Sequence, residues 1–225
     1  MKNIVIIPAR GGSKRLPGKN FLPLGGMPLI EHSIDYALAN DELIGRIIVS
    51  TDDLAVKEIA DKKGAEVVER PTHLSSDTAA TVSALKHVLE SINFEAENVI
   101  LLQPTSPLRP KNLLTEAFQK YKEGNYDSLM TVTRSYQKFG KIENKRFVPF
   151  NYDMGQRSQD IEPLYYENGL LYITKASLIL GEKILGEYNF PFIVDHPFAE
   201  VDIDFKKDLE YAEFLLERER RKTEK

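Results

Sequence analysis

The first part of the chain alternates short, mainly apolar runs with longer segments in which apolar residues recur at helical spacing. The apolar runs occupy residues 4–7, 46–50, 65–69, 98–102 and 128–133. Strands that are buried on both faces of a parallel sheet are nearly continuous in apolar residues, whereas half-exposed strands alternate. These runs therefore predict the strands of a buried, mostly parallel sheet.

The segments between the runs carry their apolar residues on one helical stripe. They predict helices at 29–38, 55–63, 82–92 and 113–121, with a final helix that begins near Phe205. Gly64 follows the second of these helices and is a typical helix terminator. Repeated strand–helix–strand units predict an α/β protein with three layers, in which helices cover both faces of the sheet. In such Rossmann-like sheets, ligands bind beyond the carboxyl ends of the strands.

This regular pattern breaks after Thr133. Residues 135–167 are polar, aromatic and irregular, and that length is too great for a plain loop in a compact domain. Regular structure is expected again at 169–173 and 192–194. We therefore expect one domain over 1–225, with an inserted subdomain at approximately 135–190 that is built of extended hairpins.

Composition narrows the function without changing this fold. With 30 basic and 34 acidic residues, the formal charge of -4 gives no electrostatic reason to expect nucleic acid as a partner. The chain has no cysteine, which excludes disulfides, thiolate zinc sites and cysteine nucleophiles. Neither a signal peptide nor an apolar stretch that could span a bilayer is recognisable, so we expect a cytoplasmic protein with no membrane partner.

The loop after the first predicted strand holds the most distinctive chemistry. Residues 10–20 contain four cationic side chains and three glycines. Glycines allow successive backbone N–H groups to approach an anion, and arginine and lysine supply the counter-charge for a polyphosphate. The alternative is a solvated charged turn. A P-loop is disfavoured by Asn20 and Pro17, and the dinucleotide-binding glycine pattern is absent.

A second candidate site is the segment 201–204, in which Asp202 and Asp204 lie two residues apart. In an extended segment both carboxylates point to the same side. Such hard oxygen ligands suit Mg²⁺, which is often shared with substrate phosphates. The alternative is that Asp204 caps the N-terminus of the final helix.

Several motifs occur in the same order along the chain as in one known family. They are IPARGGSK at 7–14, LPGKN at 16–20, VSTD at 49–52, RP at 70–71, SDTA at 76–79, LLQPTSPLR at 101–109, NG at 168–169 and VDID at 201–204. This ordered set resembles the acylneuraminate cytidylyltransferase family, the CMP-sialic acid synthetases and their nonulosonate relatives.

The resemblance implies a nucleotidyltransferase fold and an activity. CMP would move from CTP to the anomeric hydroxyl of an acidic nine-carbon sugar, and pyrophosphate would leave. The cofactor would be Mg²⁺, held by Asp202 and Asp204, and the protein would be a homodimer through its inserted subdomain. The catalytic groups would be Arg10, Lys14 and Lys19, which would face the phosphates.

The resemblance also assigns binding residues. Those expected at the nucleotide are Ala9, Arg10, Gly11, Lys14, Lys19, Asn20, Arg70, Asp77, Ala79, Ala80 and Thr81. Those expected at the sugar are Gln103, Lys141, Arg157, Tyr166, Asn168 and Tyr172. Tyr166 stands where sialic acid synthetases often carry arginine, which leaves the identity of the sugar open. Two alternatives are a Kdo or other sugar nucleotidyltransferase, and a protein that binds CTP without turnover.

Overall fold

The structure of the protein is a computed structural model that describes residues 2–76, 78–93 and 95–223. Asp77, one of the expected nucleotide-binding residues, lies outside the described residues. Among the described helices, none is both long and apolar enough to cross a membrane.

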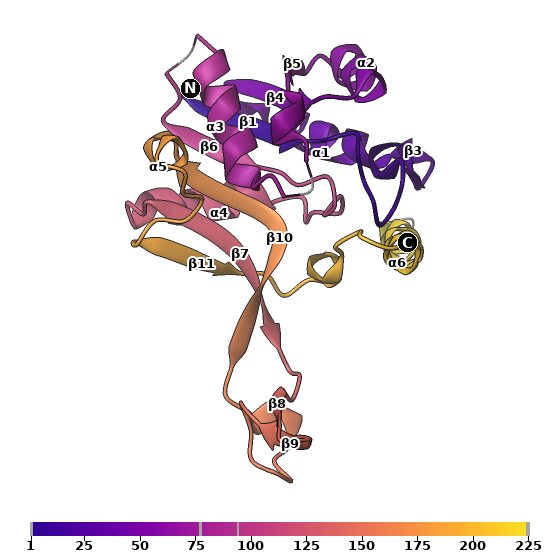
Figure 1. Cartoon of the computed structure of the whole chain (residues 1–225), viewed down its shortest axis with the longest axis vertical. Helices are drawn as coiled ribbons and strands as arrows, with labels where there is room; N and C mark the ends of the chain where they lie inside the picture. The colour runs from indigo at the N-terminus through magenta and orange to yellow at the C-terminus, as the bar shows by residue number, and fades with distance from the viewer. Residues whose placement is uncertain (1, 77, 94, 224–225) are drawn as a thin grey trace.

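A seven-stranded sheet forms the centre of the molecule, with the strand order β11-β7-β10-β6-β1-β4-β5 (Figure 1). The strands are β1 (Asn3–Pro8), β4 (Arg46–Thr51), β5 (Glu66–Glu69), β6 (Asn98–Leu101), β7 (Ser128–Ser135), β10 (Leu164–Lys175) and β11 (Asn189–Ile193). Neighbouring strands are parallel except at β10, which runs antiparallel to β6 and β7. The predicted mostly parallel sheet is confirmed.

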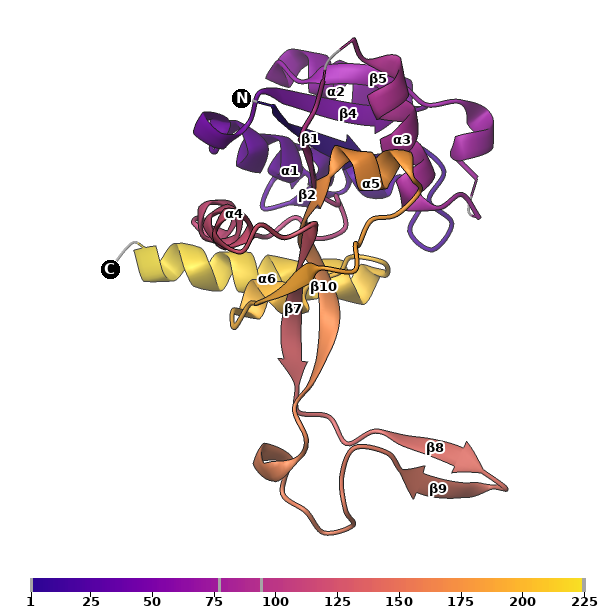
Figure 2. The same cartoon turned by 90° about the vertical axis from the view of Figure 1, so that its left-hand side faces the viewer.

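Helices cover both faces of this sheet, as the apolar stripes predicted. The helices are α1 (Leu29–Leu38), α2 (Leu54–Lys63), α3 (Thr81–Ser91), α4 (Leu113–Glu123), α5 (Ala176–Leu180) and α6 (Lys206–Thr223). One core cluster joins α1, α2 and α4 to the sheet, and a second joins α3 and α5 to its other face. The sheet and its two helical layers make the expected three-layer fold (Figure 2).

Local capping explains why the predicted helix boundaries were close to the observed ones. The carboxylate of Asp53 accepts hydrogen bonds from the backbone N–H groups of Ala55 and Val56, which begins α2. Gly64 ends the same helix with a φ of 79°, a left-handed conformation that glycine adopts without strain. A third apolar cluster packs α6 against Leu24 of β2 (Pro23–Leu24), a strand that pairs with β3 (Met27–Pro28).

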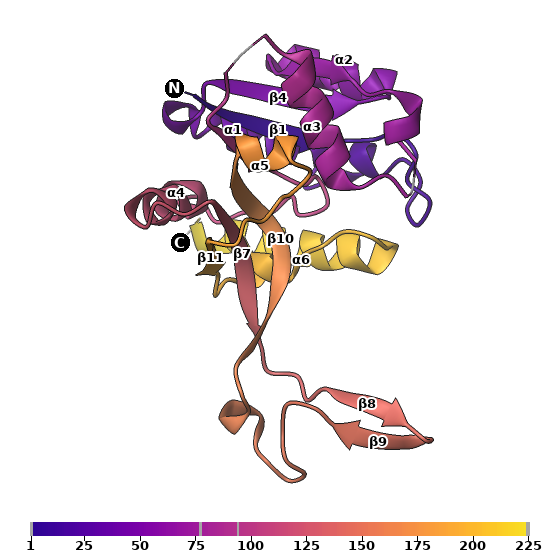
Figure 3. The ribbon, with the colours of Figure 1, turned by 60° about the vertical axis from the view of Figure 1, so that its left-hand side comes forward.

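Strands β7 and β10 extend past the body of the molecule as a two-stranded ribbon, and residues 136–163 continue beyond it (Figures 1 and 3). We call residues 136–163 the arm. Its regular part is the hairpin of β8 (Gly140–Glu143) and β9 (Arg146–Pro149). The projecting segment is shorter than the expected range 135–190, because the chain rejoins the central sheet at Leu164 and continues into α5 and β11.

Candidate functional site

The glycine-rich loop leaves β1 at the carboxyl edge of the sheet and is held there by its own polar groups. Ala9 N–H donates to the carbonyl oxygen of Ser50 at 2.9 Å, and Gly11 N–H donates to Asp52 Oδ1 at 2.9 Å. A Cβ on Gly11 would lie 2.8 Å from Asp53 Oδ2, so a larger residue would force this approach apart. The buried Asn20 side chain donates to the carbonyl oxygen of Arg10 and closes the loop.

A basic hollow opens above this loop. It has a volume of about 300 Å³ and is lined by Arg10, Ser13, Lys14, Arg15 and Lys19. The loop therefore brings together the three residues expected to be catalytic and adds Arg15. Four cationic side chains around one hollow suit a polyphosphate, because each can donate charge-assisted hydrogen bonds to phosphate oxygens.

A second cleft adjoins the basic hollow, since Arg10 lines both. Its volume is about 220 Å³, and it lies between the carboxyl ends of β1 and β6 and the start of α3. Its lining includes five of the residues expected at the nucleotide, namely Arg10, Arg70, Ala79, Ala80 and Thr81, together with Gln103 from the expected sugar set. The two hollows together offer space for a base and its triphosphate.

Arg70 forms one wall of this cleft and is buried. Its Nε donates to Ser50 Oγ at 3.1 Å, and its Nη2 donates to the carbonyl oxygen of Ser50 at 2.8 Å. Burial lowers the pKa of Arg70 to about 10, while the charge of Asp52 acts in the opposite direction. The guanidinium therefore stays charged at neutral pH and is fixed in orientation.

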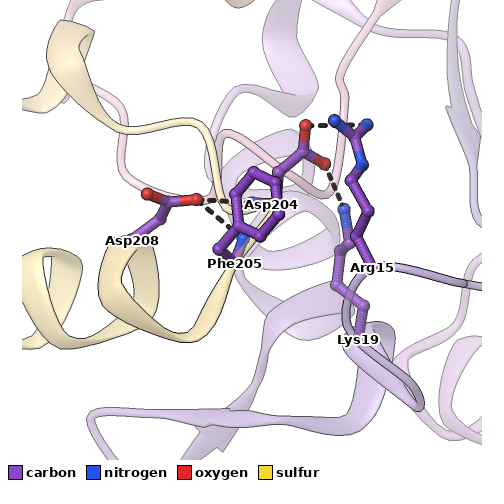
Figure 4. A network of polar contacts seen from close by, with 5 residues as sticks. All are labelled: Arg15, Lys19, Asp204, Phe205 and Asp208. Carbon is purple, nitrogen blue, oxygen red and sulfur yellow. Dashed lines mark hydrogen bonds and ion pairs between the residues drawn. The ribbon is translucent and has the colours of Figure 1, made fainter.

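The acidic segment 201–204 lies against the glycine-rich loop. Val201 and Ile203 are buried, and Ile203 N–H donates to the carbonyl oxygen of Thr105 at 2.7 Å. Asp202 and Asp204 alternate with these buried residues, so their carboxylates point toward the surface of the same edge. Asp204 Oδ1 binds Lys19 Nζ at 2.7 Å, and its Oδ2 binds Arg15 Nη2 at 2.8 Å (Figure 4).

The alternative role for Asp204, as a helix cap, is taken by another residue. Asp208 Oδ2 accepts hydrogen bonds from the backbone N–H groups of Asp204 and Phe205, at 3.0 and 2.7 Å (Figure 4). The Asp204 carboxylate faces Lys19 and Arg15 instead. The Asp204 carboxylate is therefore used for ion pairs with the glycine-rich loop and not for capping α6.

The acidic pair offers two carboxylates, the kind of ligand that Mg²⁺ prefers. The pKa of Asp202 is raised, first because protein around the carboxyl removes it from water and then because the Asp204 charge is near. A cation between these carboxylates would offset that cost. Within the part of the chain that the structure describes, no cluster of three or more histidine or acidic side chains could hold a metal. The remaining ligands would therefore come from water and from substrate phosphates, as is common for Mg²⁺.

The Asn168–Gly169 motif acts on the shape of β10. Asn168 is buried, accepts a hydrogen bond from Thr131 Oγ1 at 2.6 Å and donates one to Thr133 Oγ1 at 3.0 Å. These bonds hold an irregularity in the β10–β7 ladder, in which Gly169 has a φ of 72°. A Cβ on Gly169 would lie 2.9 Å from Gln103 Oε1. The Asn168 side chain therefore shapes the wall beside Gln103, and its expected contact with the sugar stays a prediction.

Arg109 is a residue of the site that sequence reasoning did not select. It is buried, and its guanidinium donates three hydrogen bonds. Nε donates to the carbonyl oxygen of Leu170 at 2.7 Å, Nη2 to that of Gln103 at 2.8 Å, and Nη1 to Ser33 Oγ at 3.1 Å. Burial lowers the pKa of Arg109 to about 10. Arg109 thus ties the turn that carries Gln103 to the irregular part of β10. The only sequence signal was its place at the end of the LLQPTSPLR motif.

Three expected sugar contacts lie on β10, namely Asn168, Tyr166 and Tyr172. The Tyr172 hydroxyl donates to Glu167 Oε2 at 2.9 Å, and its pKa is raised by burial, by this bond and by the charges of Glu167 and Asp202. Tyr172 is therefore close to the acidic pair. The pKa of the exposed Tyr166 is raised by partial burial and by the charge of Glu200.

The other two expected sugar contacts lie in the arm. Lys141 Nζ lies 5.7 Å from the centre of the Phe150 ring, and Arg157 Nε binds Asp160 Oδ2 at 2.7 Å. All three ribbon views place the arm well away from α3, at whose start the cleft lies (Figures 1 to 3). A single chain therefore does not bring Lys141 and Arg157 to Gln103.

Comparison with solved structures supports the fold. A CMP-2-keto-3-deoxy-manno-octonic acid synthetase complexed with CTP aligns with a TM-score of 0.73 and 19% identity, over 97% of this chain and 100% of that chain. The 4-diphosphocytidyl-2C-methyl-D-erythritol synthase of Anaerococcus prevotii aligns with a TM-score of 0.71 and 15% identity, over 96% of each chain. At these identities the likeness shows that the chain has the fold of these proteins.

Sequence relatives are more similar to this chain than these two structures are, and they show its family. The N-acylneuraminate cytidylyltransferase of Streptococcus agalactiae serotype III is 38% identical over 215 residues, which are 92% of this chain and 52% of that protein. The chain thus spans about half the length of that relative. The pseudaminic acid cytidylyltransferase of Campylobacter jejuni is 34% identical over 96% of both chains, and the CMP-N,N'-diacetyllegionaminic acid synthase of Legionella pneumophila is 32% identical over 96% and 97%. Residues 4–224 match the family model described as Cytidylyltransferase, so this chain belongs to the cytidylyltransferase family.

Proposed function

We propose that this protein transfers CMP from CTP to the anomeric hydroxyl of a nonulosonic acid and releases pyrophosphate. The observation that carries the proposal is the basic hollow and the adjoining cleft, which share Arg10 and lie beside the Asp202–Asp204 pair. The names of three relatives, which act on N-acylneuraminate, pseudaminic acid and N,N'-diacetyllegionaminic acid, support the class of acceptor.

In this proposal the cytosine lies in the cleft between Arg70 and the segment 79–81, and the triphosphate lies in the basic hollow. The fixed guanidinium of Arg70 and the backbone at the start of α3 offer donors and acceptors that are set before the base arrives. Arg10, Lys14 and Lys19 then face the phosphates. Lys19 is held by Asp204, which couples the phosphate site to the acidic pair.

The chemical step forms one P–O bond and breaks another. The oxygen of the anomeric hydroxyl attacks the α-phosphorus in line and loses its proton to solvent water. The bond from that phosphorus to the bridging oxygen breaks, and pyrophosphate takes the electron pair. The protein contributes position and charge stabilisation, with Lys14 and Arg10 donating to the oxygens on which negative charge grows. Asp202 and Asp204 would hold Mg²⁺, which when bound supplies Lewis-acid stabilisation of phosphate charge.

We also propose that the active form is a homodimer in which the arm completes the partner's sugar site. The arm exposes large apolar side chains that a single chain leaves in water, including Ile142 at 74% and Met154 at 77% exposure, with Phe139, Phe147 and Phe150. Such a surface is typical of a protein interface. Lys141 and Arg157, remote from the cleft of their own chain, would reach the cleft of the second copy.

A turnover assay tests this function. The protein is incubated with CTP, ATP, GTP or UTP, with Mg²⁺ or with a chelator, and with a panel of acceptors. The panel is N-acetylneuraminate, pseudaminic acid, N,N'-diacetyllegionaminic acid and 2-keto-3-deoxy-manno-octonic acid. We expect pyrophosphate and a CMP-sugar only with CTP, Mg²⁺ and one or more of the nine-carbon acids. Turnover restricted to the octonic acid would contradict the acceptor class. Calorimetric CTP binding without pyrophosphate from any acceptor would contradict the enzyme.

A further inference from the structure

Arg15 lies between the basic hollow and the acidic segment and contacts both parts of the candidate site. It lines the hollow with three other cationic side chains. Its Nη2 donates to Asp204 Oδ2 at 2.8 Å, and its guanidinium carbon lies 5.6 Å from the centre of the Phe205 ring (Figure 4). A cation above an aromatic ring is attracted to the negative face of that ring. Asp204 and Phe205 therefore hold the guanidinium beside the acidic pair.

Asp204 binds two cationic side chains, one on each carboxylate oxygen. Its Oδ1 accepts from Lys19 Nζ at 2.7 Å, and its Oδ2 accepts from Arg15 Nη2. These positive charges offset the negative charge that attracts a divalent cation, and a metal ion at this carboxylate would be repelled by both of them. Metal binding at Asp204 is therefore tighter when one of the two side chains moves away.

The two side chains differ in how firmly they are held. The Lys19 side chain is 10% exposed, and its backbone begins the short 3₁₀ helix η1 (Lys19–Phe21). The Arg15 side chain is 61% exposed. An ion pair that solvent reaches this freely changes an equilibrium by about fivefold at most. Arg15 can therefore leave Asp204 at little cost in free energy, whereas Lys19 stays bound to it.

The basic hollow offers Arg15 a second partner of opposite charge. A triphosphate carries several negative charges, and a planar guanidinium binds two phosphate oxygens at once through charge-assisted hydrogen bonds. Because Arg15 lines this hollow, a phosphate bound in it would lie beside the guanidinium. A move of Arg15 from Asp204 to that phosphate would remove one positive charge from the acidic pair and add one to the nucleotide site.

We propose, on the basis of the function above, that Arg15 is a further phosphate-binding residue, which exchanges Asp204 for the triphosphate when CTP binds. While Arg15 is bound to Asp204, its charge opposes a metal ion at the acidic pair. Once it is bound to phosphate, it stabilises the nucleotide and no longer opposes the metal. Arg15 therefore acts with opposite sign on the two ligands, which a residue that only shapes the loop would not do.

The test measures the binding of each ligand separately on the full-length protein. Mn²⁺ replaces Mg²⁺ in a titration without nucleotide that is followed by electron paramagnetic resonance, and CTP binding is measured by calorimetry with Mg²⁺ present. Arg15→Gln should lower the Kd for Mn²⁺ by about threefold, because a positive charge beside Asp204 is lost. The same variant should raise the Kd for CTP by about tenfold, as loss of a charged hydrogen bond to phosphate does.

Two further variants serve as controls. Lys57→Ala removes an exposed lysine from α2 and should change neither Kd. Arg15→Lys keeps the positive charge and should return the Kd for Mn²⁺ to the wild-type value. Its Kd for CTP should lie between those of the wild type and Arg15→Gln, because lysine lacks the planar fork of arginine.

Any result other than these opposite shifts would overturn the exchange. A higher Kd for both ligands in Arg15→Gln would make Arg15 a residue that shapes the loop. A higher Kd for CTP alone would make it a phosphate contact that does not affect the metal, and two unchanged values would leave it on the solvated surface. Failure of the proposed function is distinct, because neither measurement needs an acceptor sugar. A protein that shows both shifts but forms no CMP-sugar would keep the exchange and lose the function.

Discussion

The carboxyl edge of the sheet and the arm place polar and apolar side chains in opposite environments. At the edge, polar groups are buried and bonded to one another, as Asn20, Arg70 and Arg109 show. In the arm, apolar side chains such as Ile142 and Phe147 face water. Asn20, Arg70 and Arg109 therefore find hydrogen-bond partners within one chain, whereas these apolar side chains of the arm find no packing partner there.

The arm nevertheless has a defined structure, because specific hydrogen bonds hold it. Asn151 is buried at its base, accepts the N–H of Phe139 and donates to the carbonyl oxygen of Gln137. The arm thus has a defined surface, and in the proposed dimer its partner is a second copy of the chain. In the same proposal the edge receives a small, highly charged ligand, and the arm receives a large apolar surface.

The largest effect should come from removing the acidic pair at the edge. Changing Asp202 and Asp204 together to asparagine should lower kcat with CTP and Mg²⁺ by at least about 10³-fold, because the carboxylates that would hold the metal are lost. Circular dichroism and the melting temperature should show that the fold survives. Asp208→Asn is the matched control, since it alters the helix cap beside the pair and should leave activity within a few-fold. Near-normal turnover in the double variant would remove the pair from the mechanism.

Most of the fold could be predicted because its signals are local. The apolar runs 46–50 and 98–102 fall within a residue of β4 and β6, and Gly64 marks the end of α2 through its own backbone preference. The antiparallel direction of β10 was not predicted. Its pairing with β6 and β7 depends on contacts between residues that are far apart in sequence, and the chain pattern carries no sign of strand direction.

The residues of the candidate site also form two groups, those that local sequence signals reveal and those that only the folded chain reveals. The basic loop and the acidic pair could be found because charge and glycine are visible in the sequence. Arg109 could not, because an arginine that is buried against Leu170 and Gln103 looks like any other arginine until the fold exists. In the proposed dimer, the roles of Lys141 and Arg157 depend on a second copy of the chain, which the sequence pattern cannot position.

A second prediction concerns the charge in the basic hollow. Lys14→Ala should lower kcat by about 10²-fold with a small change in the KM for CTP, because the lysine is expected to stabilise charge that grows in the transition state. The control is Lys57→Ala, which removes an exposed lysine from α2 without touching the hollow. Should both variants keep wild-type kcat, Lys14 would belong to the solvated surface of the loop.

A third prediction tests, by mixing two variants, whether the edge of one chain and the arm of another form one site. Arg157→Ala should lower kcat/KM for the sugar by about tenfold, as loss of one charged hydrogen bond to a carboxylate does. Mixing this variant with Asp204→Asn, after subunit exchange, should restore about a quarter of wild-type activity. Half of the random dimers are mixed, and each mixed dimer has one site with both residues intact.

The same mixture can also contradict shared sites. If Arg157 serves the cleft of its own chain, each mixed dimer has one site that lacks Asp204 and another that lacks Arg157. No activity beyond the average of the two parents is then expected. Sedimentation of the unmixed variants, which should both remain dimers, separates this outcome from a failure to assemble.

The smallest expected effect is a gain in stability at the edge. The folded state raises the pKa of Asp202, so ionising it opposes folding, and this penalty grows as pH rises from below its ordinary value toward neutrality. Asp202→Asn should therefore raise the free energy of unfolding at pH 7 in the presence of a chelator, by less than about 1 kcal/mol because the side chain is partly exposed to screening solvent. The gain should shrink as pH falls below about 4, where both states are protonated.

Asp153→Asn in the arm is the control, and denaturant melts at several pH values provide the measurement. A loss at pH 7 would mean that the Thr105 hydrogen bond and the Lys19 charge outweigh the burial of the Asp202 carboxylate. A gain that does not change with pH would mean that it does not come from the ionisation of Asp202.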